Sequence, residues 1–281
     1  MLKFLSLSSG SCGNCYFLSD GKSGLLIDAG VSVRRLKKTL MDNGLGVDSF
    51  QAVLVTHDHL DHIRHLGSYC KHLKKPVYAT STLHDALSRH TFTRDYIAGC
   101  RCVLPDGEPF RIHLTQDAGE DESPLVSHFV VPHDATQTVG YFIDWSGVKF
   151  FLMTDAGRVT DEAVEYARRS DAVVFESNYD SGMLIGGPYT HELKMRICQG
   201  NGHLSNDECA SAVRRFWHPG LRNLFLCHLS ENNNTPSLAF EASAEALRSI
   251  PAGDGHTAKD ITNLQTLPRT HASSMFTLTS F

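Results

Sequence analysis

A short run of histidine and aspartate directly after an apolar segment constrains this chain more than any other feature. The run occupies residues 57–62, has the form H-x-H-x-D-H, and follows the segment Ala-Val-Leu-Val-Thr at residues 52–56. This arrangement predicts a buried strand that carries metal-type ligands at its end. Two imidazoles two residues apart can chelate one divalent ion, and the aspartate and histidine beyond them can face a second ion. The spacing therefore predicts two metal ions, and a solvated polar turn is the alternative that it disfavours.

Four more apolar runs end in polar residues suited to such a site. In chain order these residues are Asp28, His133, Asp155 and His228. Together with residues 57–62, their order resembles the metallo-β-lactamase superfamily of hydrolases. The resemblance implies that Asp28 supports the metal loop and that Asp155 bridges the two ions.

The resemblance also implies two sets of ligands that share the bridging aspartate. The first set is His57, His59, His133 and Asp155. The second set is Asp61, His62, Asp155 and His228. Taken alone, each histidine could be an ordinary interior or surface residue and Asp155 a turn residue, so the prediction rests on their joint appearance. Nitrogen and oxygen donors suit Zn, Mn or Fe, and the sequence does not choose among these metals.

The second half of the chain adds polar residues that a metal site alone does not require. A strand-like run ends at Glu176, His203 precedes a helix that begins near Ser205, and the sequence H-L-S recurs at residues 228–230. These features, with S-S-G-S-C-G-N at residues 8–14, resemble the YycJ/WalJ family of bacterial exonuclease-like proteins over residues 2–234. His203 could donate a proton to a leaving oxygen or clamp a phosphate, and Glu176 could orient its ring. The alternatives are a helix cap for His203 and a plain strand-end carboxylate for Glu176.

The turn at residues 9–14 is open to two interpretations. Its backbone amides could form an anion nest near the metals, or it could be a turn without function. Cys12 and Cys15 form a C-x-x-C pair, but a zinc ribbon would need a second matching pair, and the other close cysteines, Cys100 and Cys102, are one residue apart. We therefore interpret Cys12 and Cys15 as turn residues.

We expect a dinuclear metal-dependent hydrolase that acts as a phosphodiesterase on nucleic acid. The family resemblance implies a 5′–3′ exonuclease, with DNA favoured over RNA, and Asp61 could hold the proton of the nucleophile. Alternatives are a ribonuclease, a thioester or lactone hydrolase of the glyoxalase II kind, and a metal-bearing scaffold. The thioester or lactone hydrolase would leave Glu176, His203 and the asparagines at 232–233 without a role. A scaffold would be expected to lack a ligand, and the sequence supplies all of them.

Composition and charge are compatible with this expectation. A chain of 281 residues, 41% of them hydrophobic, can build one domain over residues 1–281. The net charge of −5 argues mildly against a nucleic-acid partner, but two divalent ions would add about +4 at the site. No apolar stretch approaches the ~18 residues that span a bilayer, and residues 1–15 lack the apolar core of a signal peptide. We therefore expect a cytoplasmic protein without a membrane partner, with eight reduced cysteines and an oligomeric state that the sequence leaves open.

The periodicity predicts a mixed α/β fold, and the resemblance implies the αββα four-layer sandwich of the metallo-β-lactamase type. Strand patterns cover residues 2–7, 15–18, 24–28 and 75–79, and four or five more occur within residues 101–153. Helix patterns cover residues 31–43, 82–88, 160–169 and 205–216. In the first helix Leu36, Leu40 and Met41 are expected on the apolar side. The polar and acidic run at residues 116–124 predicts a surface loop.

Overall fold

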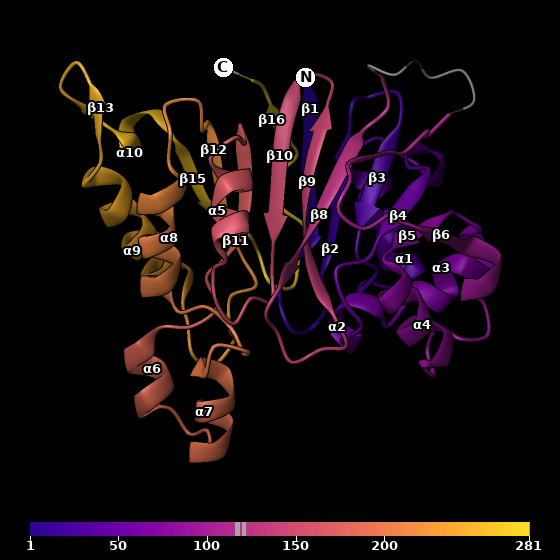
Figure 1. Ribbon diagram of the computed structural model, residues 1–281, viewed down its shortest axis with the longest axis horizontal. Helices are drawn as coiled ribbons and strands as arrows, with labels where there is room; N and C mark the ends of the chain where they lie inside the picture. Colours follow the sequence, from indigo (N-terminus) through magenta and orange to yellow (C-terminus); the bar gives the residue numbers. More distant parts are fainter. Residues whose placement is uncertain (116–118, 120–121, 281) are drawn as a thin grey trace.

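The computed structural model describes residues 1–115, 119 and 122–280, and in these residues two seven-stranded sheets pack face to face (Figure 1). The first sheet has the order β16 (Phe276–Leu278), β1 (Leu2–Ser8), β2 (Cys15–Ser19), β3 (Gly24–Ile27), β4 (Ala52–Leu54), β5 (Val77–Ala79) and β6 (Arg101–Val103). The second has the order β15 (Asn263–Thr266), β12 (Asn223–Cys227), β11 (Ala172–Glu176), β10 (Val148–Met153), β9 (Thr138–Trp145), β8 (Leu125–Val131) and β7 (Phe110–Arg111). A small separate hairpin joins β13 (Pro251–Gly253) and β14 (His256–Thr257).

Helices cover the outer face of each sheet, so the αββα four-layer sandwich is confirmed (Figure 1). Beside the first sheet are α1 (Val33–Asp42), α2 (Leu60–Ile63), α3 (Leu66–Leu73) and α4 (Ser81–Arg89), with the short helices η1 (Val47–Ser49) and η2 (Ile97–Cys100). Beside the second are α5 (Asp161–Ala167), α8 (Asn206–Phe216), α9 (Pro236–Arg248) and α10 (Ala258–Ile261). Two further helices, α6 (Ser181–Gly186) and α7 (His191–Cys198), project beyond one edge of the sandwich.

The direction of the strands brings the polar strand ends to one edge. β3, β4, β5 and β6 are parallel neighbours, as are β10, β11 and β12. β8 is antiparallel to β9, which is antiparallel to β10, so β8 and β10 run in the same direction. The residues that follow the carboxyl ends of β3, β4, β8, β10, β11 and β12 therefore gather at the edge from which α6 and α7 project.

Aromatic packing joins the two sheets. The ring of Phe4 in β1 lies 5.3 Å from that of Phe150 in β10 and 5.0 Å from that of Phe225 in β12, measured between centroids. Every residue of β12 is buried, because its sheet is covered by β1 and β16 on one side and by helices on the other. A second apolar cluster fills the space between this sheet and α5, α8 and α9. The sandwich thus provides a rigid frame for the polar edge.

Local signals set the helix boundaries well, with one error in α1. The Ser32 side chain accepts from the Arg35 amide and starts α1, and a capping box of Ser205 and Glu208 starts α8. Met41 is 69% exposed, so its expected place on the apolar side is wrong. It lies 100° around the helix from Leu40, and α1 instead buries Leu36, Thr39 and Leu40.

The structure also bears on several other expectations from the sequence. All eight cysteines are free thiols, with Cys12 exposed and Cys15 buried. Most of the predicted loop at 116–124 lies outside the described residues. Within the described ranges, no helix has the length and apolar character that crossing a membrane requires. The sequence expectations did not include α6, α7 and α9, and α6 and α7 prove to border the site.

Candidate metal centre

The strand ends bring the sequence-predicted ligands into two adjoining groups. His57, His59 and His133 form one group, and Asp61, His62, Asp155 and His228 form the other. The ligand atoms within each group lie within 4.8 Å of one another. The residues come from both sheets, because His57 follows β4 whereas Asp155 follows β10. Each group therefore has the donor number and the compactness that a divalent ion requires.

The hydrogen bonds of His57 leave one ring nitrogen free for a ligand. The Thr56 hydroxyl donates to Asp28 Oδ2 at 2.8 Å, so it accepts from His57 Nδ1 at 3.0 Å. His57 Nε2 is buried and has no hydrogen-bond partner among the residues described. Burial, followed by the neighbouring charge of His62, holds the pKa of His57 well below its usual value. A neutral imidazole with a buried, unpaired nitrogen fits a metal ion at this position.

Asp155 lies between the two groups, as a bridging ligand must. Its Oδ1 is 3.8 Å from His133 Nε2 and its Oδ2 is 3.1 Å from His62 Nε2. Burial alone would raise the pKa of Asp155, but the charges of His228 and His62 outweigh burial and lower it far below the usual value. The carboxylate is therefore ionised and can offer one oxygen to each group.

The second group closes through Asp61 and His228. Asp61 Oδ2 is 3.3 Å from His228 Nε2, and it accepts from Asn14 Nδ2 at 3.0 Å. Burial would lower the pKa of His228, but Asp155, with the hydrogen bonds of Asp61 and Glu176, raises it to about 10. The buried or half-buried carboxylates of Asp61, Asp155 and Glu176 thus attract positive charge to this group. A cation would find a favourable environment there.

The turn at residues 9–14 supports the ligands instead of presenting a ring of free amides. The amides of Ser9, Gly10, Gly13 and Asn14 all donate to acceptors within the protein. The anion-nest interpretation is therefore wrong for these four residues. Asn14 Nδ2 lies 2.8 Å from His62 Nε2 as well as contacting Asp61, so the turn holds the second group in place. Only the glycine-rich composition of the turn signalled this role in the sequence.

Glu176 and His203 form a pair that shares Asp155 and His228 with the second group, so these four residues make a third group of possible ligands. His203 Nδ1 lies 2.7 Å from Glu176 Oε1, and Glu176 Oε2 accepts from the Ala156 amide at 2.7 Å. Burial would lower the pKa of His203, but the charge of Glu176 outweighs it and raises the pKa. Helix α8 takes Ser205 as its N-cap, so the alternative of a capping role for His203 is wrong. The ring is therefore fixed at Nδ1 and keeps its other nitrogen for the pocket.

Hydrogen bonds to groups outside the two sets orient three of the histidines. His62 Nδ1 lies 2.7 Å from Asp28 Oδ2, which agrees with the supporting role implied for that aspartate. His133 Nδ1 lies 2.7 Å from the Gly202 carbonyl oxygen, and His59 Nε2 lies 3.2 Å from that of Asp134. Such outer hydrogen bonds fix the ring orientation of a histidine ligand. Asp134 and Gly202 had no role in the sequence analysis, because their partners are distant in the chain. Thr56 had none either, because its contact with Asp28 spans 28 residues.

Three site residues adopt a left-handed backbone, which is uncommon for residues other than glycine. The φ angles are 64° for Asp28, 54° for Asp155 and 54° for His228. Each residue follows directly or closely the end of a buried strand, and each side chain turns into the cluster. Conformations of this kind cost about 1–3 kcal/mol and occur where the surrounding structure enforces them, as at functional sites.

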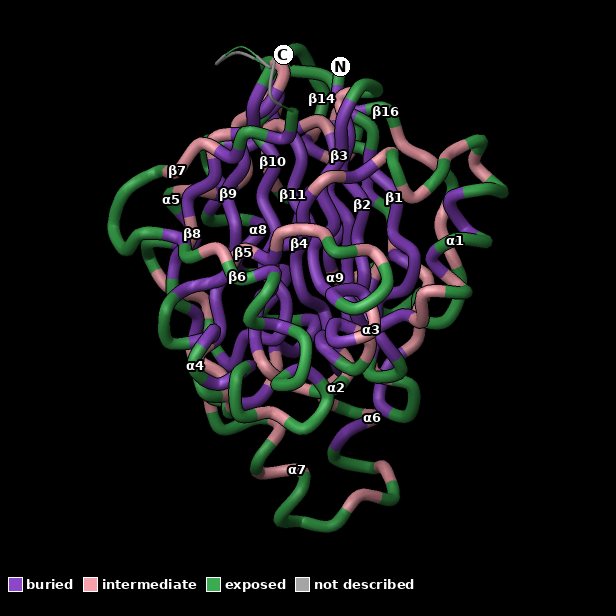
Figure 2. The backbone as a smooth tube through the Cα atoms, turned by 90° about the vertical axis from the view of Figure 1, so that its right-hand side faces the viewer, coloured by how far each residue is buried: buried purple, intermediate pink, exposed green. Residues whose placement is uncertain are grey.

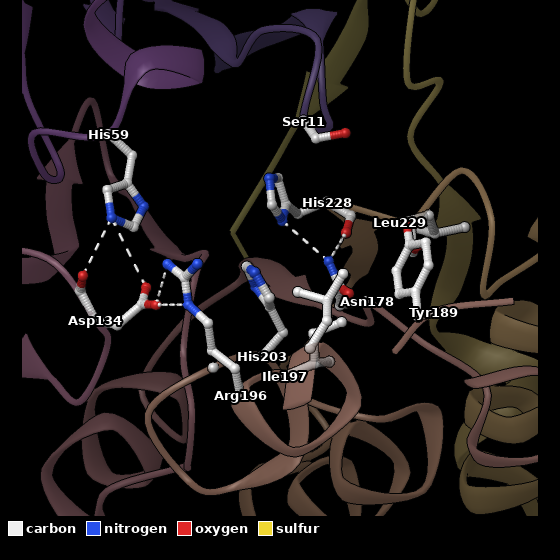
Figure 3. A pocket seen from close by; sticks show the side chains of 13 residues that line it. Ser11, His59, Asp134, Asn178, Tyr189, Arg196, Ile197, His203, His228 and Leu229 are labelled. Atoms are coloured by element: carbon white, nitrogen blue, oxygen red, sulfur yellow. Dashed lines mark hydrogen bonds and ion pairs between the residues drawn. The ribbon is translucent and has the colours of Figure 1, made fainter. Parts of the chain in front are cut away.

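A pocket of about 280 Å³ opens above these residues (Figure 3). His59, His203 and His228 reach it from the cluster, and α7 forms the opposite wall. Ser11 from the 9–14 turn and Ser230 from the H-L-S run also line it. A substrate in this pocket would therefore touch His59 and His228 of the two ligand groups and His203 at the same time.

A two-sheet αββα sandwich with histidine and carboxylate clusters at one edge defines a class of metal-dependent hydrolases. The sequence model of the beta-lactamase superfamily domain matches residues 24–228. The exodeoxyribonuclease YycJ of Bacillus anthracis is 31% identical over 254 residues, which cover 90% of this chain and 92% of that protein. The chain therefore belongs to the metallo-β-lactamase superfamily and, within it, to the YycJ/WalJ family, and it is a metal-dependent hydrolase.

Two further comparisons agree. The exodeoxyribonuclease WalJ of Streptococcus pneumoniae (strain D39) is 29% identical over 253 residues, which cover 90% of this chain and 91% of that protein. The crystal structure of the metallo-β-lactamase fold protein YhfI of Bacillus subtilis superposes with a TM-score of 0.66. It shares 13% identity and covers 98% of this chain and 100% of its own, so it is similar in fold.

Proposed function

We propose that this hydrolase is a phosphodiesterase that degrades nucleic acid from an end, with DNA favoured over RNA and a 5′–3′ direction. The observation that carries the proposal is the Glu176–His203 pair, which lies beside Asp155 and His228 of the second ligand group and presents His203 to the pocket. The names of the two curated relatives, both exodeoxyribonucleases, support the choice of DNA. Exonuclease action and its direction rest on this family relationship alone.

The proposal includes two divalent ions that share Asp155. His57, His59, His133 and Asp155 would hold one ion, and Asp61, His62, Asp155 and His228 the other. The unpaired His57 Nε2 and the ionised, buried Asp155 fit these roles. When bound, two such ions neutralise phosphate charge and make water a nucleophile near neutral pH.

The chain's own groups would handle the two protons of the reaction. Asp61 has an 18% exposed side chain, and its Oδ2 is held by Asn14, so we assign it the proton lost by the attacking water. His203 would give its Nε2 proton to the leaving oxygen, because Nδ1 is tied to Glu176. The raised pKa of His203 keeps that proton available at neutral pH. Glu176 acts through His203 and is therefore a positioning residue.

The test is a panel of substrates given to the purified protein with Mn²⁺. DNA and RNA, single- and double-stranded and labelled at the 5′ or 3′ end, are compared with a chromogenic thioester and a β-lactam. We expect mononucleotides or short products from DNA, released from the 5′ end, and slower cleavage of RNA. Hydrolysis of the thioester without cleavage of either nucleic acid would replace the proposal with the glyoxalase II alternative, and RNA cleavage alone would make the protein a ribonuclease.

A further inference from the structure

The α6–α7 arm, residues 181–198, uses its apolar side chains in an unusual way. It is inserted between β11 and α8 and lies outside the sandwich (Figures 1 and 2). Among the described residues of the arm, α6 buries Leu184, whereas α7 buries none of its eight residues. Short helices of globular proteins normally bury an apolar face against the core. Leu193 and Ile197 of α7 line the pocket beside the metal ligands instead.

The pocket has an apolar side and a catalytic side. Tyr189, Ile197 and Leu229 lie on one side of it, and His59 lies on the opposite side (Figure 3). His203 stands between them. Leu193, one helical turn before Ile197 in α7, also lines the pocket. The volume of about 280 Å³ is close to the ~300 Å³ lower limit of small-molecule sites, which suits one nucleotide unit.

Polar contacts fix the arm over the ligands. The Arg196 guanidinium of α7 pairs with Asp134 Oδ2 at 2.5 Å, and the Asp134 carbonyl oxygen accepts from His59 Nε2. At the other end of the wall, Asn232 Nδ2 donates to the Tyr189 hydroxyl at 2.9 Å. The aromatic ring is therefore held at a defined place, which reduces the ordering cost of stacking a flat ligand on it.

We propose that this wall is a binding slot for one unpaired nucleobase of the end nucleotide, with Tyr189 as the stacking surface and Leu193, Ile197 and Leu229 around it. The inference rests on the proposed nuclease function and adds how the enzyme holds the end of its substrate. A base in the slot places its own phosphodiester next to His203 and His228. Stacking on an aromatic side chain tolerates any base, so the slot serves degradation without sequence preference.

The first experiment removes the base instead of the protein group. Two single-stranded DNA substrates differ only at the end nucleotide, which carries a base in one and a tetrahydrofuran abasic analogue in the other. Stacking of one base on an aromatic side chain contributes about 1–3 kcal/mol to binding. We therefore expect the wild-type enzyme to have a KM about 10-fold higher for the abasic end than for the intact end, with a smaller change in kcat. Equal KM values for the two substrates would overturn the slot while leaving the nuclease function intact.

The second experiment pairs this substrate with variants of the arm. Tyr189→Ala should raise KM about 10-fold for the intact end and lose the discrimination against the abasic end. Tyr189→Phe keeps the ring and loses only the hydrogen bond from Asn232, so it should still discriminate between the two ends, with a smaller rise in KM. Leu193→Ser on exposed α7 gives an independent test in the same direction. Ile185→Ala is the matched control, because Ile185 lies on the same arm, is 76% exposed, and is absent from the pocket lining.

Binding measured without turnover separates the slot from the chemistry. Fluorescence anisotropy with a phosphorothioate-linked DNA strand and Mn²⁺ should show the same about 10-fold loss for Tyr189→Ala, at unchanged metal content and thermal midpoint. If Tyr189→Ala discriminates between the intact and the abasic end as strongly as wild type does, the proposed slot is overturned. If wild type cleaves no nucleic acid at all, the proposed function itself fails, and the slot fails with it.

Discussion

At the scale of single residues, the His203–Glu176 pair allows proton transfer to be tested separately from metal binding. His203 could join Asp155, Glu176 and His228 in a third group of possible ligands, but it belongs to neither ligand set that we propose. The start of α8 depends on Ser205 and not on His203. His203→Ala should therefore keep both metal ions and the fold but lose ~10²–10⁴ in phosphodiesterase rate. Rate per folded, metal-loaded molecule is the measurement, with exposed His72→Ala on α3 as control. A wild-type rate in His203→Ala would remove the assigned proton donor.

Thr56 offers a second test at this scale, because one hydroxyl joins two buried site residues. It donates to Asp28 and accepts from His57. Thr56→Val removes these contacts at nearly constant volume, and we expect metal affinity to fall about 10- to 100-fold. Competition with a coloured chelator measures the affinity.

A matched control exists in β9. The Thr138 hydroxyl is also buried but has no hydrogen-bond partner among the described residues, so Thr138→Val should leave metal affinity unchanged and stability equal or higher. If both substitutions weaken metal binding equally, the effect comes from a general loosening of the sandwich, and the role proposed for Thr56 is contradicted.

At the scale of elements, the turn after β3 and the metal loop after β4 touch without room for a side chain. A Cβ on Gly30 would lie 1.8 Å from the Asp61 carbonyl oxygen and 2.4 Å from the Asn14 amide nitrogen. Gly30→Ala must therefore separate the two turns, and we expect it to lower metal content and destabilise the fold by roughly 1–3 kcal/mol or more. Thermal unfolding with elemental analysis checks both effects.

Gly46→Ala is the control for this pair of turns. A Cβ at Gly46 meets no atom within 4 Å, and its φ of −125° suits any residue. We expect this variant to unfold at the wild-type temperature and to retain its metals. Wild-type metal content in Gly30→Ala would show that the two turns can part without disturbing the ligands.

At the scale of the whole molecule, the ligand groups connect the two sheets. His57, His59 and Asp61 extend from the first sheet, whereas His133, Asp155 and His228 extend from the second. We expect about two metal ions per chain. Asp155→Ala should remove both, because a lost bridging ligand disturbs both groups, and His59→Ala should remove the ion of the first group. Elemental analysis gives the content, and unchanged metal in Asp155→Ala would contradict the dinuclear arrangement.

The same connection links metal binding to stability. Ions that bind the folded chain and not the unfolded one stabilise it by about 2.7 kcal/mol at a hundred times their Kd. The wild-type protein should therefore unfold at a lower temperature after treatment with a chelator, and Asp155→Ala should show little further change. A chelator effect of equal size in both proteins would place the stabilising ion elsewhere.

The sequence by itself determined the strand ends, the ligands expected there and the four-layer class. The strand ends follow from local periodicity, because an apolar run that ends in histidine or aspartate predicts both a buried strand and a polar residue at its edge. The ligand sets and the four-layer class were implied by the resemblance to the metallo-β-lactamase superfamily. The same local signals set the starts of α1 and α8. They placed Met41 on the wrong face, since neighbouring apolar positions on a helix need not share a direction.

Only the tertiary structure decided what surrounds the ligands. Asn14 contacts His62 across 48 residues of chain, and His133 contacts Gly202 across 69, so no local pattern could indicate either pair. The same holds for the α6–α7 arm, whose sequence contains no ligand motif and whose Leu193 and Ile197 acquire meaning only where the arm meets the metal centre. Contacts of this kind depend on how distant segments pack, and packing is settled by the whole chain at once.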